Sequence, residues 1–459
     1  MIHTTTNLEN NQVHFNQSNT DTLNLQAKKH LERIAKNYQN NLESDYTETI
    51  DALRQHFVYS ENSNQNWTRP EFSMFYGTPL YDVASPQQKL AFNHLTWALR
   101  YGFTRIAEAE TIHYNQITGD ALATQGEAYR LIAEQLKHEA DQEQVHIRTF
   151  DQVGQATMAA IDHEQAYANL QKNFYRLSSR STKFANVQEQ IVQALPRIFL
   201  SDRSPSPYLA ALSDTDKSQL IRPKGFISGR GKVPQSLVQF FMVNWGRSPF
   251  LACQYFTIRY FANLLLKVYE HPVSSYYSNL QRQGALIPVP TAISHYHFLD
   301  ESFHTTTSLF LARDLYKDLP KPTAYEKFVA NSFLYLIQRH NLSGISGVYK
   351  TSFFGTSLYL IVGLYRLLQN PTFGLSSQEA AHWLEKCFCH EHEGFHLAEQ
   401  CRQRVRTDLR RLTEKLDYLW PVNREMQLMA DDRSISKAIA HNRRLFWLFS
   451  NLLSRGLLK

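Results

Sequence analysis

The sequence predicts an all-α fold, and three observations support this class. Only 17 Gly and 16 Pro are spread over 459 residues, which suits long helices joined by modest loops better than many short strands. No stretch alternates apolar and polar residues with the period of two that a half-buried strand requires. Hydrophobic residues make up 43% of the chain, so a large core can form. We expect a helical-bundle core with an irregular insertion and extra C-terminal helices.

The N-terminal region, residues 1–85, predicts an arm, a helix and a loop. Residues 1 to about 25 are polar and rich in Asn and Thr, and they lack the apolar core of a signal peptide. A helix is expected from Ala27 to about His56. Several Pro, Gly, Asn and Ser residues predict a loop over residues 60–85.

The core is expected over residues 86–317. Ser85 and Pro86 have the residue types of a helix cap and a first-turn proline, so a long helix should run to about Gly119. Four more helices are expected over about 124–153, 165–195, 249–271 and 290–317. Pro272 should end the helix that starts at Pro249. Residues from about 196 to 249 are rich in Pro and Gly, which predicts an irregular insertion.

The C-terminal region, residues 318–459, predicts three or four further helices packed on the core, the last of them basic and amphipathic over about 434–458. Five arginines gather on one predicted helix: Arg402, Arg404, Arg406, Arg410 and Arg411. With a formal net charge of +6, such a face is either simply solvated or attracts an anionic partner. We expect no nucleic-acid partner.

The cysteines and the apolar stretches predict a cytoplasmic protein. The four cysteines form neither a disulfide framework nor a zinc pattern and are expected as reduced thiols: Cys253, Cys387, Cys389 and Cys401. The longest apolar stretch, residues 250–269, contains Arg259 and Lys267, so it predicts a buried helix rather than a membrane span.

The pattern Glu-x-x-His occurs four times and carries the functional prediction. A Glu and a His three positions apart lie on one stripe of a helix, so both side chains reach the same metal ion. Because 19 of 459 residues are His, a given Glu has a His at +3 by chance in about 4% of cases (19/459), and even if all 42 acidic residues were Glu, fewer than two matches would arise. The four matches are Glu110/His113, Glu143/His146, Glu301/His304 and Glu393/His396.

One of these pairs belongs to a three-residue stripe. At about 100° per residue, His297, Glu301 and His304 lie at about 0°, 40° and −20° around a helix. Three such side chains among Phe and Leu residues are costly to bury unless a cation balances them. Glu143 and His146 repeat the arrangement on another helix, so the sequence predicts a metal centre.

A dinuclear site built from two such helices needs one carboxylate from each of two more. Glu110 is the first candidate because it shares a stripe with Leu99, Ile106 and Ile117, whereas Glu108 is turned about 160° away. Glu270 is the second candidate. It falls in the last turn before the expected helix end, where the helix dipole disfavours an anion, and a carboxylate there indicates a use.

Together these residues resemble the ferritin-like di-iron carboxylate proteins. Glu270 and Asp300-Glu301-Ser-Phe-His304 match the pattern E-x(28–37)-D-E-x-x-H, with 29 intervening residues (300 − 270 − 1). His297 resembles the extra histidine ligand of the p-aminobenzoate N-oxygenase group. The resemblance, which covers about residues 85–315, implies the ligand set Glu110, Glu143, His146, Glu270, His297, Glu301 and His304. Gln142 stands where the family has an Asp that orients the histidine, which leaves Asp141 or Glu139 as the expected partner of His146.

The size of the chain and the segments 75–81 and 93–97 are more similar to the dimetal-carboxylate halogenases that act on fatty acyl chains. This resemblance implies two iron ions, with manganese an alternative in one position, and dioxygen and chloride as co-substrates. It further implies an electron donor and an acidic acyl carrier protein that presents the chain.

Three alternatives stay open. The runner-up is an arylamine N-oxygenase or a hydroxylase at the same centre, and a metal-free helical scaffold that binds an acidic partner is the third. Within the segment His390-Glu-His-Glu393-Gly-Phe-His396, the histidines form a second metal site, replace part of the first, or belong to a polar surface stretch, which is the favoured interpretation.

Overall fold

The computed structural model describes residues 29–162, 198, 235–350, 355–431 and 434–457, and within these ranges every regular element is helical. This confirms the all-α prediction. The elements before the bundle are α1 (Lys29–Glu43), α2 (Thr47–Gln55), α3 (Tyr59–Asn62), the 3₁₀ turn η3 (Pro70–Phe72) and α4 (Pro79–Val83). The long helices that follow are α5 (Pro86–Ala123), α6 (Glu127–Asp162), α11 (Pro249–Arg282) and α12 (Val289–Arg313).

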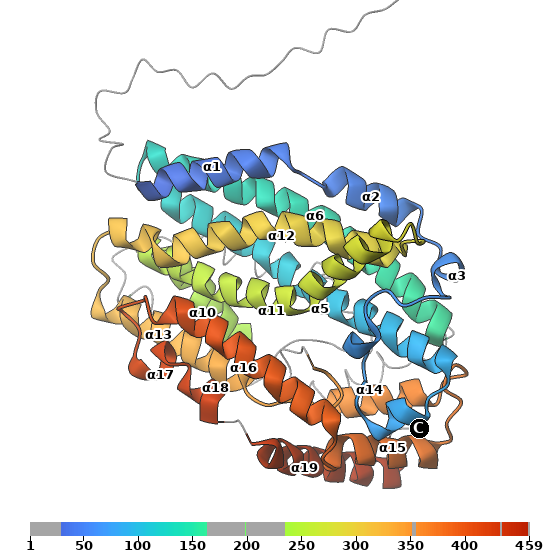
Figure 1. Ribbon diagram of the computed structural model, residues 1–459. Helices are drawn as coiled ribbons and strands as arrows, with labels where there is room; N and C mark the ends of the chain where they lie inside the picture. The colour runs from blue at the N-terminus through green and yellow to red at the C-terminus, as the bar shows by residue number, and fades with distance from the viewer. Residues whose placement is uncertain (1–28, 163–197, 199–234, 351–354, 432–433, 458–459) are drawn as a thin grey trace, which may run out of the picture.

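These four long helices form a bundle of two hairpins. α5 packs along α6, α11 packs along α12, and α5 also packs on α11 (Figure 1). α1 and α2 cover the outer side of α6 and α12. The α5 start follows the sequence prediction, because the Ser85 side chain accepts a hydrogen bond from the Gln88 backbone and Pro86 occupies the first turn.

The bundle interior is divided into two apolar clusters with a polar layer between them. One cluster contains Tyr101 of α5 and Phe150 of α6, and it continues into the C-terminal helices. The other contains Ile117 of α5 and Leu136 of α6. The residues between these levels on α5 and α6 include buried carboxylates and a buried histidine. A polar layer at this depth needs internal partners because water does not reach it.

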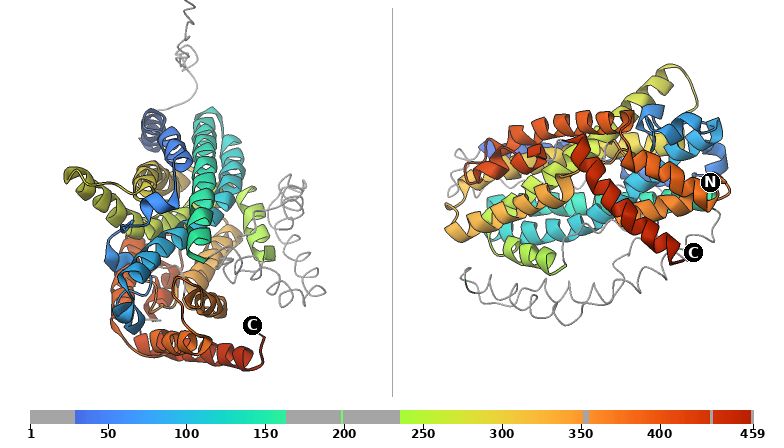
Figure 2. Two further views of the ribbon diagram at one scale, coloured as in Figure 1. Left: turned by 90° about the vertical axis from the view of Figure 1, so that its right-hand side faces the viewer. Right: turned by 90° about the horizontal axis from the view of Figure 1, so that it is seen from below.

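The C-terminal helices lie against one side of the bundle (Figures 1 and 2). In the described part of the chain they are more numerous than the three or four expected: α13 (Ala324–Ile337), α14 (Leu358–Leu368), α15 (Ser377–Cys389), α16 (Glu393–Thr413), α17 (Pro421–Arg424), α18 (Gln427–Asp431) and α19 (Ile435–Ser454). A 3₁₀ turn, η4 (Leu315–Asp318), precedes α13, and a π-helical turn, η5 (Gln338–Leu342), follows it.

Several expected boundaries were wrong. Pro272 lies inside α11, which continues to Arg282, because its neighbours Tyr269 and Val273 are fully buried and hold the helix in the hairpin. Residues 235–245, assigned to the irregular insertion, form the helix α10 (Gln235–Trp245). The helix expected over 27–56 breaks into α1 and α2. The helix expected over 165–195 lies outside the described residues.

The cysteines are free, with Cys401 partly exposed and the other three buried. In the described part of the chain, no helix combines the length and the apolar character needed to cross a bilayer.

Candidate metal centre

Six of the seven residues predicted as ligands are buried inside the bundle. Their exposed fractions lie between 0% and 3%. They come from three helices: Glu143 and His146 from α6, Glu270 from α11, and His297, Glu301 and His304 from α12. The stripe predicted on α12 is therefore confirmed as an inward-facing stripe.

Glu110 does not face inward, and this expectation was wrong. Its side chain is exposed and accepts a hydrogen bond from the Tyr114 hydroxyl at 3.4 Å. Glu108, which was expected to point away, is only 5% exposed and lies among the other carboxylates and imidazoles. Leu99 and Ile117 of the predicted stripe are buried, but they lie nearer the ends of α5. At the level of Glu110 the buried side chains of α5 are polar, so the apolar stripe does not mark the inward face there.

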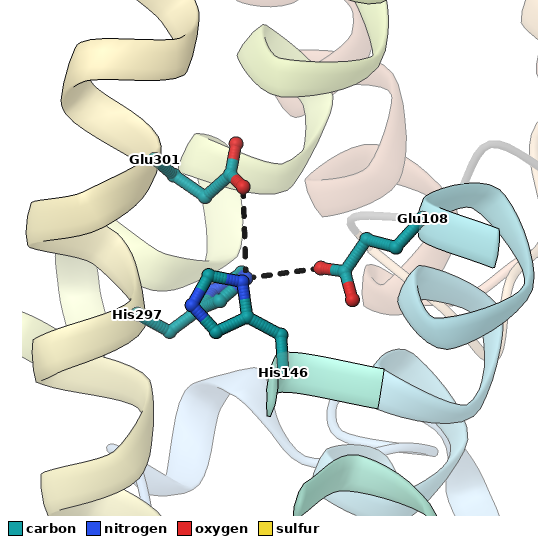
Figure 3. A group of neighbouring side chains, drawn as sticks. All are labelled: Glu108, His146, His297 and Glu301. Carbon is teal, nitrogen blue, oxygen red and sulfur yellow. Dashed lines mark hydrogen bonds and ion pairs between the residues drawn. The ribbon is translucent and has the colours of Figure 1, made fainter. Parts of the chain in front are cut away.

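The side chains form two groups with metal-ligand spacing. Glu108, His146, His297 and Glu301 each offer a donor atom within 4.8 Å of the others, and Figure 3 shows these four side chains converging from α5, α6 and α12. The second group is Glu143, Glu301 and His304, with the same limit on separation. Glu301 belongs to both groups, as a bridging carboxylate between two neighbouring ions would.

His297 lies between two carboxylates. Its Nε2 is 3.0 Å from Glu108 Oε1, and its Nδ1 contacts Glu270 Oε1, which also accepts a hydrogen bond from the Tyr101 hydroxyl at 2.9 Å. The other oxygens of Glu108 and Glu270 are buried without a hydrogen-bond partner among the described residues. Buried carboxylate oxygens without partners are costly, so each of these two oxygens needs a cation or another hydrogen-bonding partner, although Glu270 itself belongs to neither metal-ligand group.

Each Glu-x-x-His histidine has a hydrogen-bonding partner on the other Glu-x-x-His helix. Asp300 Oδ2 of α12 is 3.1 Å from His146 Nε2, and Gln142 Oε1 of α6 is 2.9 Å from His304 Nε2. The expectation that Asp141 or Glu139 replaces the missing partner of His146 was therefore wrong. Asp141 forms an exposed ion pair with Lys137 instead.

Arg259 of α11 is a buried cation beside the second group. Its guanidinium donates to the Glu139 carboxylate, to Glu143 Oε1 at 3.2 Å and to Asn115 Oδ1 at 3.3 Å. It is 4% exposed, and the nearby carboxylates raise its pKa further against the effect of burial. The sequence does not identify Arg259 as a site residue, because its partner Glu139 is 120 positions away.

The pKa values show how strongly the site needs positive charge. Burial lowers the pKa of His146, but Asp300 and Glu143 raise it to about 9. The pKa values of His297 and His304 lie well above the usual range, since carboxylates outweigh their burial. Burial and the neighbouring Glu143 raise the pKa of Glu108 to about 7. Without a metal ion, protons on the imidazoles supply the charge that metal ions would bring.

The donor set fits a pair of divalent ions. Two divalent ions balance the four negative charges of the glutamates in this set when ionised: Glu108, Glu143, Glu270 and Glu301. The other two buried carboxylates of this layer have partners of their own, since Glu139 pairs with Arg259 and Asp300 with His146. Three imidazoles complete a set of oxygen and nitrogen donors without thiolate. This set suits iron or manganese better than structural zinc.

The C-terminal histidines do not join a metal-ligand group in the described part of the chain. His396 pairs with Glu391 at 3.0 Å in an exposed position, and His392 Nε2 is 2.7 Å from the Cys387 carbonyl oxygen. The adjacent Gly394 donates its backbone N–H to the Gly77 carbonyl oxygen, so this segment holds the start of α16 against the N-terminal loops.

The segments 75–81 and 93–97 lie outside the metal-ligand groups. The Asn93 side chain binds the Trp67 backbone N–H and the Thr68 carbonyl oxygen, and Trp97 Nε1 donates to Ser294 Oγ at 2.7 Å. These residues fix the loops before α5 and the start of α12 on the bundle.

The fold and the site define an all-α bundle with a buried carboxylate–histidine cluster suited to two metal ions. The chain belongs to the CylC-like acyl halogenase family, because the family model described as "Acyl halogenase CylC-like" matches residues 29–450. This membership supports a halogenase that acts on an acyl substrate. No curated protein and no solved structure matches the chain.

Proposed function

We propose that the protein is a non-haem di-iron enzyme that halogenates an unactivated carbon of a fatty acyl chain carried on an acyl carrier protein, in natural-product biosynthesis. One observation carries the proposal beyond family membership. The bundle interior of this acyl halogenase family member contains four buried glutamates and three buried histidines of the proposed ligand set, and carboxylate oxygens of Glu108 and Glu270 lack hydrogen-bond partners among the described residues. Two iron ions bound there would activate dioxygen to oxidise a C–H bond in the presence of chloride.

The chain's own residues hold and shield this centre. Glu108, His146 and His297 would hold one ion, which we call the first position. Glu143 and His304 would hold a second ion, and Glu301 belongs to both groups. Glu270 lies beside the first position, held by the Tyr101 hydroxyl. The apolar clusters at both ends of the layer exclude water, which strengthens electrostatic interactions and limits side reactions. Activation of dioxygen at a diferrous centre consumes electrons, so the proposed reaction includes an external electron donor that returns the centre to the diferrous state.

The direct test is chlorination of a carrier-bound acyl chain. Protein reconstituted with ferrous iron, dioxygen and a reductant is expected to add one chlorine, seen as the chlorine isotope pattern in mass spectra of the acyl carrier protein. Omitting chloride should abolish that product, and Glu301→Ala should abolish turnover. Manganese in one position is tested by the metal content of the active protein.

The alternatives give different results in the same assay. A hydroxylated acyl chain that forms regardless of chloride indicates a hydroxylase. Oxidation of an arylamine without acyl turnover indicates the N-oxygenase. A protein that binds no iron after anaerobic reconstitution is a scaffold, and the proposal then fails.

We infer that the acidic carrier protein docks on the exposed face of α19. Lys437, Arg444 and Leu448 lie on one stripe of this helix, and Trp447 beside them is 66% exposed. α19 lies on the outside of the C-terminal helices (Figure 2). Three of the five arginines expected on α16 are less available, because Arg402 is buried and Arg410 and Arg411 pair with carboxylates. Basic residues around an exposed aromatic side chain suit an acidic partner with an apolar patch.

Arg444→Glu and Trp447→Ala are therefore expected to raise KM for the carrier-bound substrate by about tenfold each. Turnover of a small acyl thioester without a carrier should not change, because neither residue lies near the metal-ligand groups. Lys415→Glu, which reverses an exposed charge outside α19, is the matched control. An unchanged KM in both α19 variants would place the carrier elsewhere.

A further inference from the structure

His146 and His304 have hydrogen-bonding partners at equivalent positions, but the two partners differ in charge. Both imidazoles direct Nδ1 toward the Glu of their own motif and Nε2 toward the other helix. The residue that meets Nε2 directly precedes the Glu of the opposite motif in each case. For His146 this residue is a carboxylate, Asp300, and for His304 it is a neutral amide, Gln142.

The orientation of the Gln142 amide is fixed from outside the bundle. Asn41 of α1 donates to Gln142 Oε1 at 3.1 Å, and Gln142 Nε2 donates to Asn41 Oδ1 at 3.0 Å. Gln142 and Asn41 are 1% and 0% exposed, so no water replaces these bonds. The amide therefore presents its oxygen to His304 as an acceptor, with no negative charge. Asp300 is tied to the same region because its Oδ1 accepts from the Tyr46 backbone N–H.

Both the number of protein donors and the local charge favour metal binding at the His146 position over the His304 position. The position at His146 has four protein donors, and the position at His304 has three. Arg259 places a guanidinium against Glu143, a member of the three-donor group, and competes with a metal ion for that carboxylate. Glu139 offsets part of this charge, since it is the closest partner of Arg259.

We propose that the two metal positions are unequal, with the His304 position weaker and exchangeable because Gln142, held by Asn41, replaces a carboxylate behind its histidine. This inference rests on the proposed metal centre. A carboxylate that accepts a hydrogen bond from a ligating imidazole makes the imidazole a better electron donor, and losing such a partner lowers metal affinity by about 10- to 100-fold. Gln142 is thus a positioning residue that keeps the second ion loosely bound.

The consequence is ordered loading. The His146 position fills first, and the second ion enters only at higher metal concentration and leaves first on dilution. With three protein donors, the second position also leaves more of its coordination sphere to small ligands such as water or halide.

An anaerobic titration of the metal-free protein with Mn²⁺, followed by electron paramagnetic resonance, tests the proposal without using activity. Isolated and paired Mn²⁺ ions give different spectra. In the wild type, isolated ions should dominate up to one ion per chain, and paired ions should appear only as the second step fills. Gln142→Glu keeps the side-chain length and adds a charge, so the second step should tighten by about 10- to 100-fold.

Asp300→Asn is the reciprocal variant. It should weaken the first step by a similar factor and leave the second step almost unchanged, whereas general damage to the fold would weaken both. Two outcomes would refute the unequal positions but leave the metal centre in place. One is paired ions from the first addition in the wild type, and the other is a second step that Gln142→Glu does not tighten. A wild-type protein that binds no Mn²⁺ or Fe²⁺ would remove the proposed metal centre and this inference together.

Discussion

Glu108→Ala is expected to lose at least one of the two metal ions, whereas Glu110→Ala is expected to keep both. Glu108 is 5% exposed and contacts His297 within the four-donor group, so its removal takes away a charged donor that no neighbouring side chain replaces. Glu110 is an exposed residue of the same helix, bound to the Tyr114 hydroxyl. The two variants change the same residue type two positions apart, which makes them a matched pair.

The measurement is metal content by plasma mass spectrometry after anaerobic reconstitution with ferrous iron. Glu301→Ala belongs in the same series because Glu301 joins both groups, and it should lose both ions. Far-ultraviolet circular dichroism of each metal-free variant shows whether the helices persist. If Glu110→Ala loses metal and Glu108→Ala does not, Glu110 is the ligand on α5, as its apolar neighbours indicated, and the assignment of Glu108 is wrong.

The contrast between α12 and α5 explains how much of the site the sequence predicts. On α12, three ligand-type residues within eight positions define the inward face by themselves, and helical geometry gives their stripe directly. On α5, a single carboxylate had to be placed from apolar residues up to eleven positions away. The bundle interior is polar at that level, where Thr104, Arg105 and Glu108 are buried, so hydrophobicity does not mark the inside.

The α5–α6 hairpin, once its ends are known from the structure, accounts for the height of Glu108 in the bundle. The turn between α5 and α6 is centred on Gln125, and Glu108 and Glu143 lie 17 and 18 residues from it (125 − 108 and 143 − 125). Residues at equal distances from a tight helical hairpin lie at the same height. By contrast, the contacts Asp300–His146 and Gln142–His304 depend on how α6 and α12 align along their length. No short turn joins these two helices, so these contacts cannot be predicted from the sequence alone.

Arg259→Met is expected to destabilise the metal-free protein by about 3–5 kcal/mol, because it leaves buried carboxylates without their cation. Glu139 is 0% exposed and would retain only the Gln135 amide and the Thr307 hydroxyl as partners. Methionine fills a similar volume, so the loss reflects charge rather than a cavity. Urea unfolding of the metal-free protein, followed by circular dichroism, measures the free energy of unfolding.

Metal loading should recover part of this loss, since metal ions in the second position provide a new partner for Glu143 but not for Glu139. Arg259→Lys keeps the charge and should lose less than Arg259→Met. Arg411→Met is the surface control, because Arg411 pairs with Asp408 in an exposed position and such pairs contribute little. A free energy of unfolding for metal-free Arg259→Met within about 0.5 kcal/mol of wild type would mean that Glu139 and Glu143 tolerate burial without this arginine.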